Sequence, residues 1–263
     1  MELTTPTGHL EHLRYLEIEV IRRFLRPGSK ILDIGGGTGY QARLIADHGC
    51  DVLSVDIPGA EAHTQFFSVQ PYDGVNLPGD SEAFDVLFTS NVLEHVRDLE
   101  ALLKDMKRVL KKDGIVIHIL PSPSWRFWTS LAFYPYLCKN LFGRGERVAG
   151  MDTSPITMKR VGSTIKKRGL LRAVGRVFTV PLEPHGEFRN ALVELYYYSR
   201  MSWRKRFQAN GWSVQELFGN ELFYTGHSIF PRLPYTARRR MSHILGSSCN
   251  IFVLQKHRAR SVH

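Results

Sequence analysis

The chain is 263 residues long, and its 43% hydrophobic and 23% charged residues are ordinary for a globular protein with a buried core. This composition excludes collagen, a coiled coil and a disordered chain. The net charge is +10, and the three cysteines form no CxxC pair, so neither a disulfide framework nor a zinc ribbon is indicated.

The first half of the chain alternates helices with strands. Apolar residues at helical spacing predict an amphipathic helix over residues 8–25. The elements that follow are predicted in this order: a strand at 30–34, a helix at 40–48, a strand at 51–55, an irregular segment at 57–80, a strand at 84–90, a helix at 99–110 and a strand at 115–120. Asp98 is the predicted N-cap of the helix that begins at residue 99, with Lys111 and Lys112 in its last turn and Gly114 ending it.

This alternation is lost after Pro121. Regular patterns return only with a predicted helix at 201–210 and strands at 212–218 and 250–255. We therefore predict one α/β domain over residues 1–263, made of a core at 1–120, a lid or substrate-binding insertion at 121–200, and the last helices and strands at 201–263. The first-half strands lack polar alternation, which predicts a mostly parallel sheet with helices on both faces.

A glycine-rich loop, Gly35 to Gly39, joins the first strand to the next helix. Such a loop lets the backbone approach a ligand closely and presents amides at a helix N-terminus. Dinucleotide spacing would place Tyr40 where the third glycine packs helix against strand, and Asp33 ends the strand where such sites keep an apolar residue. The loop therefore favours a ligand with an amino group and a sulfonium over one with a pyrophosphate.

Several segments resemble, in order and spacing, the motifs of one enzyme family. Ile31 to Tyr40 is similar to motif I of class I (Rossmann-like, UbiE-like) S-adenosylmethionine-dependent methyltransferases. Further similar segments are residues 52–56, residues 72–78 with 84–86, residues 90–96 and residues 110–114. The resemblance covers about residues 25–122. It implies a seven-stranded Rossmann-like sheet, S-adenosylmethionine as cofactor and S-adenosylhomocysteine as product.

By this resemblance, ten residues from four loops would bind the cofactor: Asp33, Gly35, Gly37, Gly39, Asp56, Ile57, Asp73, Gly74, Val75 and Asn91. The loop glycines would carry the methionine part by their backbone, with Asp33 near its ammonium and Asn91 beneath it. Asp56 would accept hydrogen bonds from the ribose, and Asp73 would lie near the adenine amino group. The ordinary alternative for Asp56 and Asp73 is a pair of surface carboxylates. No metal site is predicted.

The general base is sought in the second half of the chain. His185 lies between Pro184 and Gly186, and a histidine there is a candidate to take a hydroxyl proton near neutral pH. The alternative for His185 is a histidine that hydrogen-bonds its own loop. His118 lies within a strand, and we interpret it as structural. His95 is not assigned a catalytic role.

Charge divides the chain unequally. Residues 1–120 hold 12 Lys and Arg against 18 Asp and Glu, whereas residues 121–263 hold 23 against 7. This asymmetry favours an anionic partner for the second half, and a solvated basic surface is the alternative. Aromatic residues gather at 125–142 and are candidates to enclose a sugar or lipid chain, or simply core.

We therefore favour a small or lipid-linked anionic acceptor, with O-methylation of a glycan-type molecule preferred. RNA is a less favoured acceptor, because basic runs at 166–168, 204–206 and 238–240 accompany no RNA-binding module. A cofactor-binding scaffold without turnover is the non-enzymatic alternative. The start of the chain lacks a secretory signal, which predicts a cytoplasmic protein, with peripheral contact at the inner membrane surface if the acceptor is lipid-linked. Neither the acceptor atom nor the oligomeric state is indicated.

Overall fold

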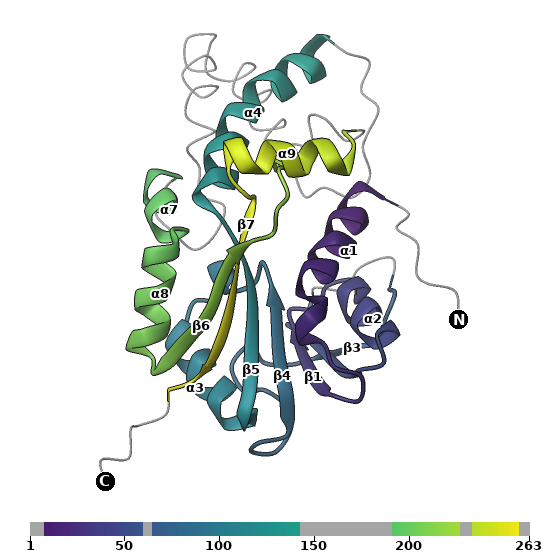
Figure 1. The fold of residues 1–263 in the computed structure, drawn as a ribbon, viewed down its shortest axis with the longest axis vertical. Helices are drawn as coiled ribbons and strands as arrows, with labels where there is room; N and C mark the ends of the chain where they lie inside the picture. Colours follow the sequence, from purple (N-terminus) through teal and green to yellow (C-terminus); the bar gives the residue numbers. More distant parts are fainter. Residues whose placement is uncertain (1–7, 60–64, 143–190, 227–232, 258–263) are drawn as a thin grey trace. The chain divides into compact units, whose positions relative to one another are not determined.

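A computed structural model describes residues 8–59, 65–142, 191–226 and 233–257, and its centre is a seven-stranded sheet (Figure 1). The strand order is β3-β2-β1-β4-β5-β7-β6. The strands are β1 (Lys30–Ile34), β2 (Asp51–Asp56), β3 (Val69–Pro71), β4 (Phe84–Ser90), β5 (Leu110–Pro121), β6 (Trp212–Gly219) and β7 (Cys249–Lys256). The neighbours among β1 to β5 pair in parallel, and β6 pairs antiparallel with β7. The predicted mostly parallel, Rossmann-like sheet is confirmed.

Helices that belong with the sheet are α1 (His9–Ile21), α2 (Tyr40–Asp47), α3 (Leu99–Val109) and α8 (Arg200–Ala209), with short 3₁₀ turns η1 (Arg22–Phe24) and η2 (Leu93–His95). One buried apolar cluster joins residues of α3 and α8 to alternate residues of the strands, such as Leu32 and Leu87. The intervening strand residues, such as Ile31 and Phe88, are fully buried outside that cluster. Both faces of the sheet are therefore covered, as predicted.

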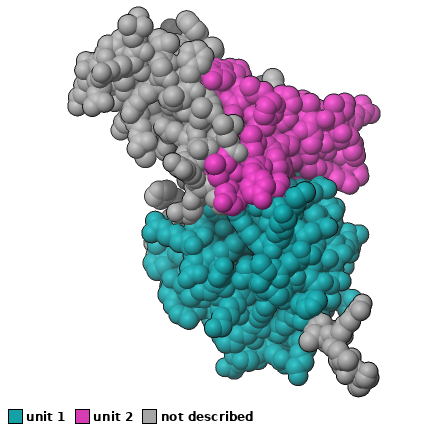
Figure 2. Space-filling model, turned by 90° about the vertical axis from the view of Figure 1, so that its left-hand side faces the viewer, with its two compact units in different colours: residues 1–120, 200–220, 250–263 teal, residues 121–199, 221–249 magenta. Residues whose placement is uncertain are grey.

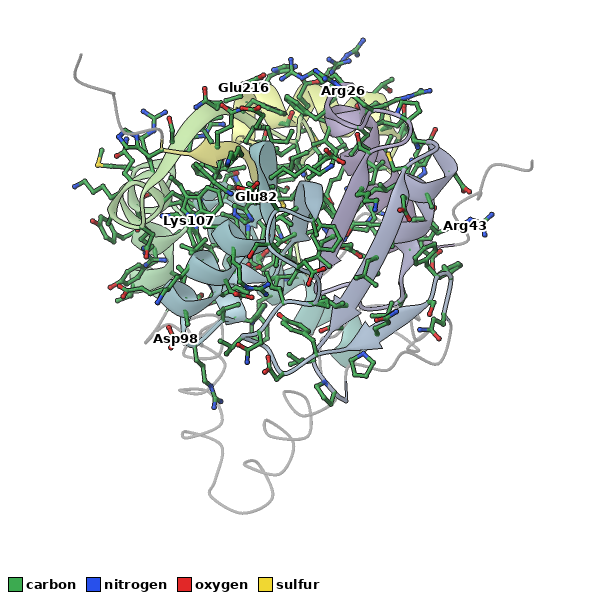
Figure 3. All side chains as sticks on the ribbon, turned by 90° about the horizontal axis from the view of Figure 1, so that it is seen from below. Arg26, Arg43, Glu82, Asp98, Lys107 and Glu216 are labelled. Atoms are coloured by element: carbon green, nitrogen blue, oxygen red, sulfur yellow. The ribbon has the colours of Figure 1, made fainter. Side chains whose placement is uncertain are left out.

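The elements differ from the predicted ones at a few boundaries. Asp98 caps α3 as expected, accepting a hydrogen bond from the Ala101 amide at 3.0 Å. However, α3 ends at Val109, so Lys107 lies in its last turn (Figure 3), and Lys111 and Gly114 belong to β5. Residues 57–80, predicted to be irregular, contain the short strand β3.

The chain divides into two compact units (Figure 2). The first holds residues 1–120, 200–220 and 250–263, and the second holds residues 121–199 and 221–249. Within the second unit lie α4 (Pro123–Phe142), α7 (Ala191–Tyr197) and α9 (Tyr235–Leu245). Residues 221–249 thus group with the segment that follows Pro121, although they lie far along the chain.

The second unit contains regular helices that sequence patterns did not indicate. Ser124 Oγ of α4 donates to the Leu245 carbonyl at the end of α9 at 2.5 Å, and Trp128 Nε1 donates to the same oxygen at 3.1 Å. Arg126 of α4 forms an ion pair with Glu194 of α7 at 2.6 Å, with the two side chains 6% and 0% exposed. Polar contacts between side chains therefore tie α4 to both α7 and α9.

Candidate functional site

The strand order places a candidate site at the carboxyl ends of β1 and β4. β2 and β3 lie on one side of β1, whereas β4 and β5 lie on the other. The connections leaving β1 and β4 therefore diverge, and open α/β sheets bind ligands at such a switch point. All ten cofactor residues expected from the sequence lie in the unit that contains this sheet.

The glycine loop after β1 adopts backbone conformations that favour glycine. Gly35, Gly37 and Gly39 have φ values of +81°, +53° and +73°. A Cβ on Gly35 would lie 2.3 Å from Val92, and one on Gly39 would lie 2.7 Å from the Phe67 carbonyl oxygen. A Cβ on Gly37 would meet nothing within 4 Å, so the loop is open above this residue.

Asp56, the last residue of β2, is held against this loop. Its Oδ2 accepts a hydrogen bond from the Gly37 amide at 2.8 Å, and its Oδ1 accepts one from the Ile57 amide at 2.7 Å. Each carboxylate oxygen can accept a further hydrogen bond. The carboxylate is thus fixed by two amides and is able to receive two hydroxyl groups.

Asp33 has a different environment. It is only 2% exposed, and the Ser54 hydroxyl on the neighbouring strand donates to its Oδ2 at 2.7 Å. Burial raises the pKa of Asp33 to about 7, the Ser54 hydrogen bond lowers it, and the charge of Asp56 raises it. A Cβ on Gly36 would be 3.0 Å from Asp33 Oδ2, so the Asp33 carboxyl group lies directly beneath the glycine loop.

The segment after β3 forms a tight turn around Asp73. Asp73 Oδ1 accepts hydrogen bonds from the Val75 and Asn76 amides at 2.9 and 2.7 Å, and the Asn76 side chain donates to its Oδ2 at 2.5 Å. These bonds, led by the one from the Asn76 side chain, lower the pKa of Asp73. Two apolar side chains in this region are exposed, Ile57 at 54% and Val75 at 38%. A Cβ on Gly74 would be 3.4 Å from Ile57, so the two loops adjoin.

Asn91 follows β4 in a left-handed conformation with φ of 55°. Its amide N–H donates to the Ile119 carbonyl at 2.8 Å. With its side-chain oxygen facing α1, as the neighbouring donors require, it accepts from Arg14 Nη1 at 2.7 Å and Nη2 at 3.1 Å. Arg14 also pairs with Glu17 at 2.7 Å. The structure thus brings the first helix to the end of β4.

Arg14 and Glu17 are residues that our sequence reasoning missed. Glu17 is fully buried, on the stripe of α1 that also buries Leu13 and Ile21. A carboxylate among the apolar positions of a helix is the signal that could have found them, because a buried charge requires a partner. One partner, Arg14, is three residues away on the same helix, whereas the second, Asn220, which donates to Glu17 at 3.0 Å, is identified only from the fold.

The histidines have separate positions. His185, the candidate base, lies outside the described residues. His118 is fully buried, hydrogen-bonded to Thr89 at 2.7 Å and stacked on Phe207. Burial lowers the pKa of His118 to about 3, so it is neutral at physiological pH, as expected of a structural residue. His95 is exposed on η2, beside buried Glu94.

Comparison with known proteins gives a family match over most of the chain. Residues 9–217 match the model of a family described as a methyltransferase domain. The fold is also that of an S-adenosylmethionine-dependent methyltransferase from Archaeoglobus fulgidus, at a TM-score of 0.52 and 14% identity, covering 94% of each chain.

Two curated relatives match shorter regions. A tRNA U34 carboxymethyltransferase of Hydrogenovibrio crunogenus is 36% identical over an alignment of 112 residues, and the match covers 36% of this chain and 33% of that protein. Phosphoethanolamine N-methyltransferase 2 of Caenorhabditis elegans is 30% identical over an alignment of 155 residues, and the match covers 52% of this chain and 34% of that protein. The chain therefore spans about a third of the length of these relatives.

Proposed function

We propose that this chain, which belongs to the class I family of S-adenosylmethionine-dependent methyltransferases, transfers a methyl group to a small or lipid-linked anionic acceptor. The observation that carries the first part is the Asp56 carboxylate, held by the Gly37 and Ile57 amides at the end of β2. The glycine loop that would receive the rest of the cofactor also holds this carboxylate, which would accept hydrogen bonds from the two hydroxyl groups of a diol. Bound there, the cofactor supplies an electrophilic methyl group on its sulfonium.

The residues around Asp56 fit an adenosine. Its two oxygens would accept the ribose hydroxyls. The exposed Ile57 and Val75 side chains would cover the faces of the adenine ring, and their exposure is otherwise unfavourable for large apolar groups. Asp73, fixed by three hydrogen bonds, would accept from the adenine amino group.

The glycine loop fits the methionine part. Gly37 lacks a packing reason to be glycine, because its Cβ would meet nothing within 4 Å. A ligand that needs this space provides one. Gly35 and Gly39 would shape the loop. Asp33 would act from beneath it on the positively charged part of the cofactor, and Asn91 would border the methionine part from the end of β4.

The acceptor is proposed from charge and composition. The second half of the chain is strongly basic, and one relative is named for phosphoethanolamine, a small phosphate-bearing acceptor. The aromatic residues of α4, among them half-exposed Phe127, favour a sugar-containing molecule, so O-methylation of a glycan-type acceptor remains our preferred reaction. His185 is the proposed base for a hydroxyl acceptor. We propose residues 121–200 as the lid.

Contact with a membrane surface would follow from a lipid-linked acceptor. Within the part of the chain that the structure describes, no helix is long and apolar enough to cross a membrane. The second unit exposes apolar Phe127, Leu131 and Ile244 together with basic Arg239 and Arg240, a composition that suits an anionic interface. We therefore propose a cytoplasmic protein that reaches the inner membrane surface peripherally.

RNA is the second candidate acceptor, because one relative is named for tRNA and α8 exposes Arg204 and Lys205. The experiment incubates the purified chain and S-adenosylmethionine labelled in the methyl group with separate lipid-linked glycan, soluble phosphorylated and RNA fractions. We expect label in a glycan or phosphorylated fraction. Label confined to RNA, and reduced by Arg204→Gln/Lys205→Gln, would replace our acceptor with RNA. Cofactor binding without label in any fraction would favour the scaffold alternative.

A further inference from the structure

The direction of the bound cofactor follows from the strand order, given the proposed function on which this inference rests. The adenosine would lie at the ends of β2 and β3. The next strands in the sheet are β1 and then β4, so the methionine part would extend across the ends of these two strands. Two strand spacings separate β2 from β4, about 10 Å. The extended chain from ribose to carboxylate can cover this interval. The methionine carboxylate would therefore arrive near the end of β4.

Arg14 lies at this position. Its Nη1 is 3.5 Å from Ser90 Oγ, and its guanidinium donates to the Asn91 side chain at 2.7 and 3.1 Å. Ser90 ends β4 and Asn91 follows it, so the positive charge lies at the carboxyl end of this strand. The Arg14 side chain is 22% exposed, so it is partly accessible from solvent.

The Glu17 carboxylate holds the Arg14 guanidinium in place. Glu17 Oε2 accepts from Arg14 Nη1 at 2.7 Å, while Glu17 Oε1 accepts from Asn220 Nδ2 at 3.0 Å. Glu17 is fully buried, so its position is set by packing as well as by these bonds. A cation with such support does not have to be ordered when an anion binds, and this lowers the entropic cost of binding.

We propose that Arg14 is the receptor for the carboxylate of the cofactor's methionine part, with Glu17 and Asn91 as the residues that position it. A carboxylate leaving water requires a charged or hydrogen-bonding partner. A guanidinium meets this need with a planar set of donors that matches the two carboxylate oxygens. The first helix then contributes to cofactor binding, together with the loops after β1, β2, β3 and β4.

Calorimetry with a pair of ligands tests this assignment. S-adenosylhomocysteine and its decarboxylated analogue share the adenosine, the sulfur and the amino group and differ in the carboxylate. We expect Arg14→Gln to weaken S-adenosylhomocysteine binding about 10- to 100-fold and binding of the analogue less than about threefold. Arg14→Lys, which keeps the charge but loses the planar donors, should recover part of the affinity.

Two further variants guard against a purely structural effect. Arg22→Gln removes an exposed arginine that pairs with Glu19 at 3.5 Å, and it should bind both ligands as the unaltered protein does. Arg14→Gln/Glu17→Gln removes both charges of this pair, so the buried Glu17 carboxylate is not left facing a neutral side chain. Circular dichroism confirms that each variant is folded.

The outcomes separate this inference from the proposed function. Selective loss of S-adenosylhomocysteine affinity in both Arg14→Gln variants supports the assignment. Equal weakening of the two ligands, or no weakening of either, overturns it while leaving the cofactor site intact. An unaltered protein that binds neither ligand overturns the proposed function, and the assignment of Arg14 falls with it.

Discussion

The Gly37 amide donates a hydrogen bond to Asp56 Oδ2 at 2.8 Å, linking the loop after β1 to the last residue of β2. The two residues are 19 positions apart, and the strands β1 and β2 that lead to them pair in parallel. This bond fixes the carboxylate beside an open stretch of backbone. Recognition of a hydroxylated ligand by Asp56 and close approach to Gly37 are therefore parts of one arrangement.

Gly37→Ala should weaken cofactor binding without unfolding the protein. The φ of +53° costs a side-chain-bearing residue about 1–2 kcal/mol, and the new methyl group would enter the space proposed for the ligand. We expect calorimetry to show about a tenfold or greater loss of S-adenosylhomocysteine affinity.

Gly28→Ala is the matched control for this change. Gly28 also has a positive φ, +80°, and open space around its Cβ, but it precedes β1 and is not part of the glycine loop. It should show a similar cost in stability and unchanged affinity. Equal affinity losses in the two variants would contradict the proposed role of Gly37.

Asp33→Asn should change how stability depends on pH. The folded pKa of about 7 is above the ordinary value of 3.8 for an aspartate, so the protonated form favours folding, and its contribution is lost as pH rises through this interval. Asn mimics the protonated acid and can still accept from Ser54. The unfolding free energy of the variant minus that of the unaltered protein should therefore be about 3 kcal/mol larger at pH 8 than at pH 5.

Urea unfolding of both proteins at the two pH values measures this difference. Asp51→Asn is a control, because Asp51 is exposed at the start of β2. It should leave the pH dependence unchanged. A constant difference in unfolding free energy between Asp33→Asn and the unaltered protein at both pH values would show that Asp33 titrates normally.

Glu194→Gln should destabilise the second unit strongly. It removes the carboxylate charge that Arg126 faces at 2.6 Å inside the protein, and loss of one partner of a buried ion pair costs about 3–5 kcal/mol. Glu221→Gln removes a carboxylate of the same unit that pairs with Arg239 at the surface, at a cost of about 1 kcal/mol or less. Thermal unfolding compares them, and similar shifts in Tm would argue against a structural role of the buried pair.

Sequence patterns predicted the sheet better than the second unit. The strands at 30–34 and 84–90 have the predicted bounds, because continuous apolar runs are typical of a doubly covered parallel sheet. β3 was missed because three residues at a sheet edge, one of them Pro71, carry almost no pattern. α4 was missed because Pro135 and a dense aromatic sequence hide its helical period.

The candidate site was predictable only where its residues are close in sequence. The glycine loop stands out because five consecutive positions, 35–39, contain four glycines. The contact between Arg14 and Asn91 spans 77 positions and depends on how α1 packs, so no local pattern predicts it. β5 begins at Leu110, directly after α3 ends at Val109, so no turn residue marks the boundary between the two elements. The lysines at 111 and 112 were therefore assigned to the helix.

Calorimetric titration with S-adenosylmethionine, S-adenosylhomocysteine and NADH, on the unaltered protein, Asp56→Ala and Asp51→Ala, tests the cofactor assignment most directly. Asp51 lies on the same strand as Asp56 and is exposed away from the glycine loop, at the opposite end of β2. We expect both sulfur-containing ligands to bind the unaltered protein and Asp51→Ala, with affinity lost in Asp56→Ala and no binding of NADH. Binding of NADH, or equal affinity of all three proteins for S-adenosylhomocysteine, would contradict the site described here.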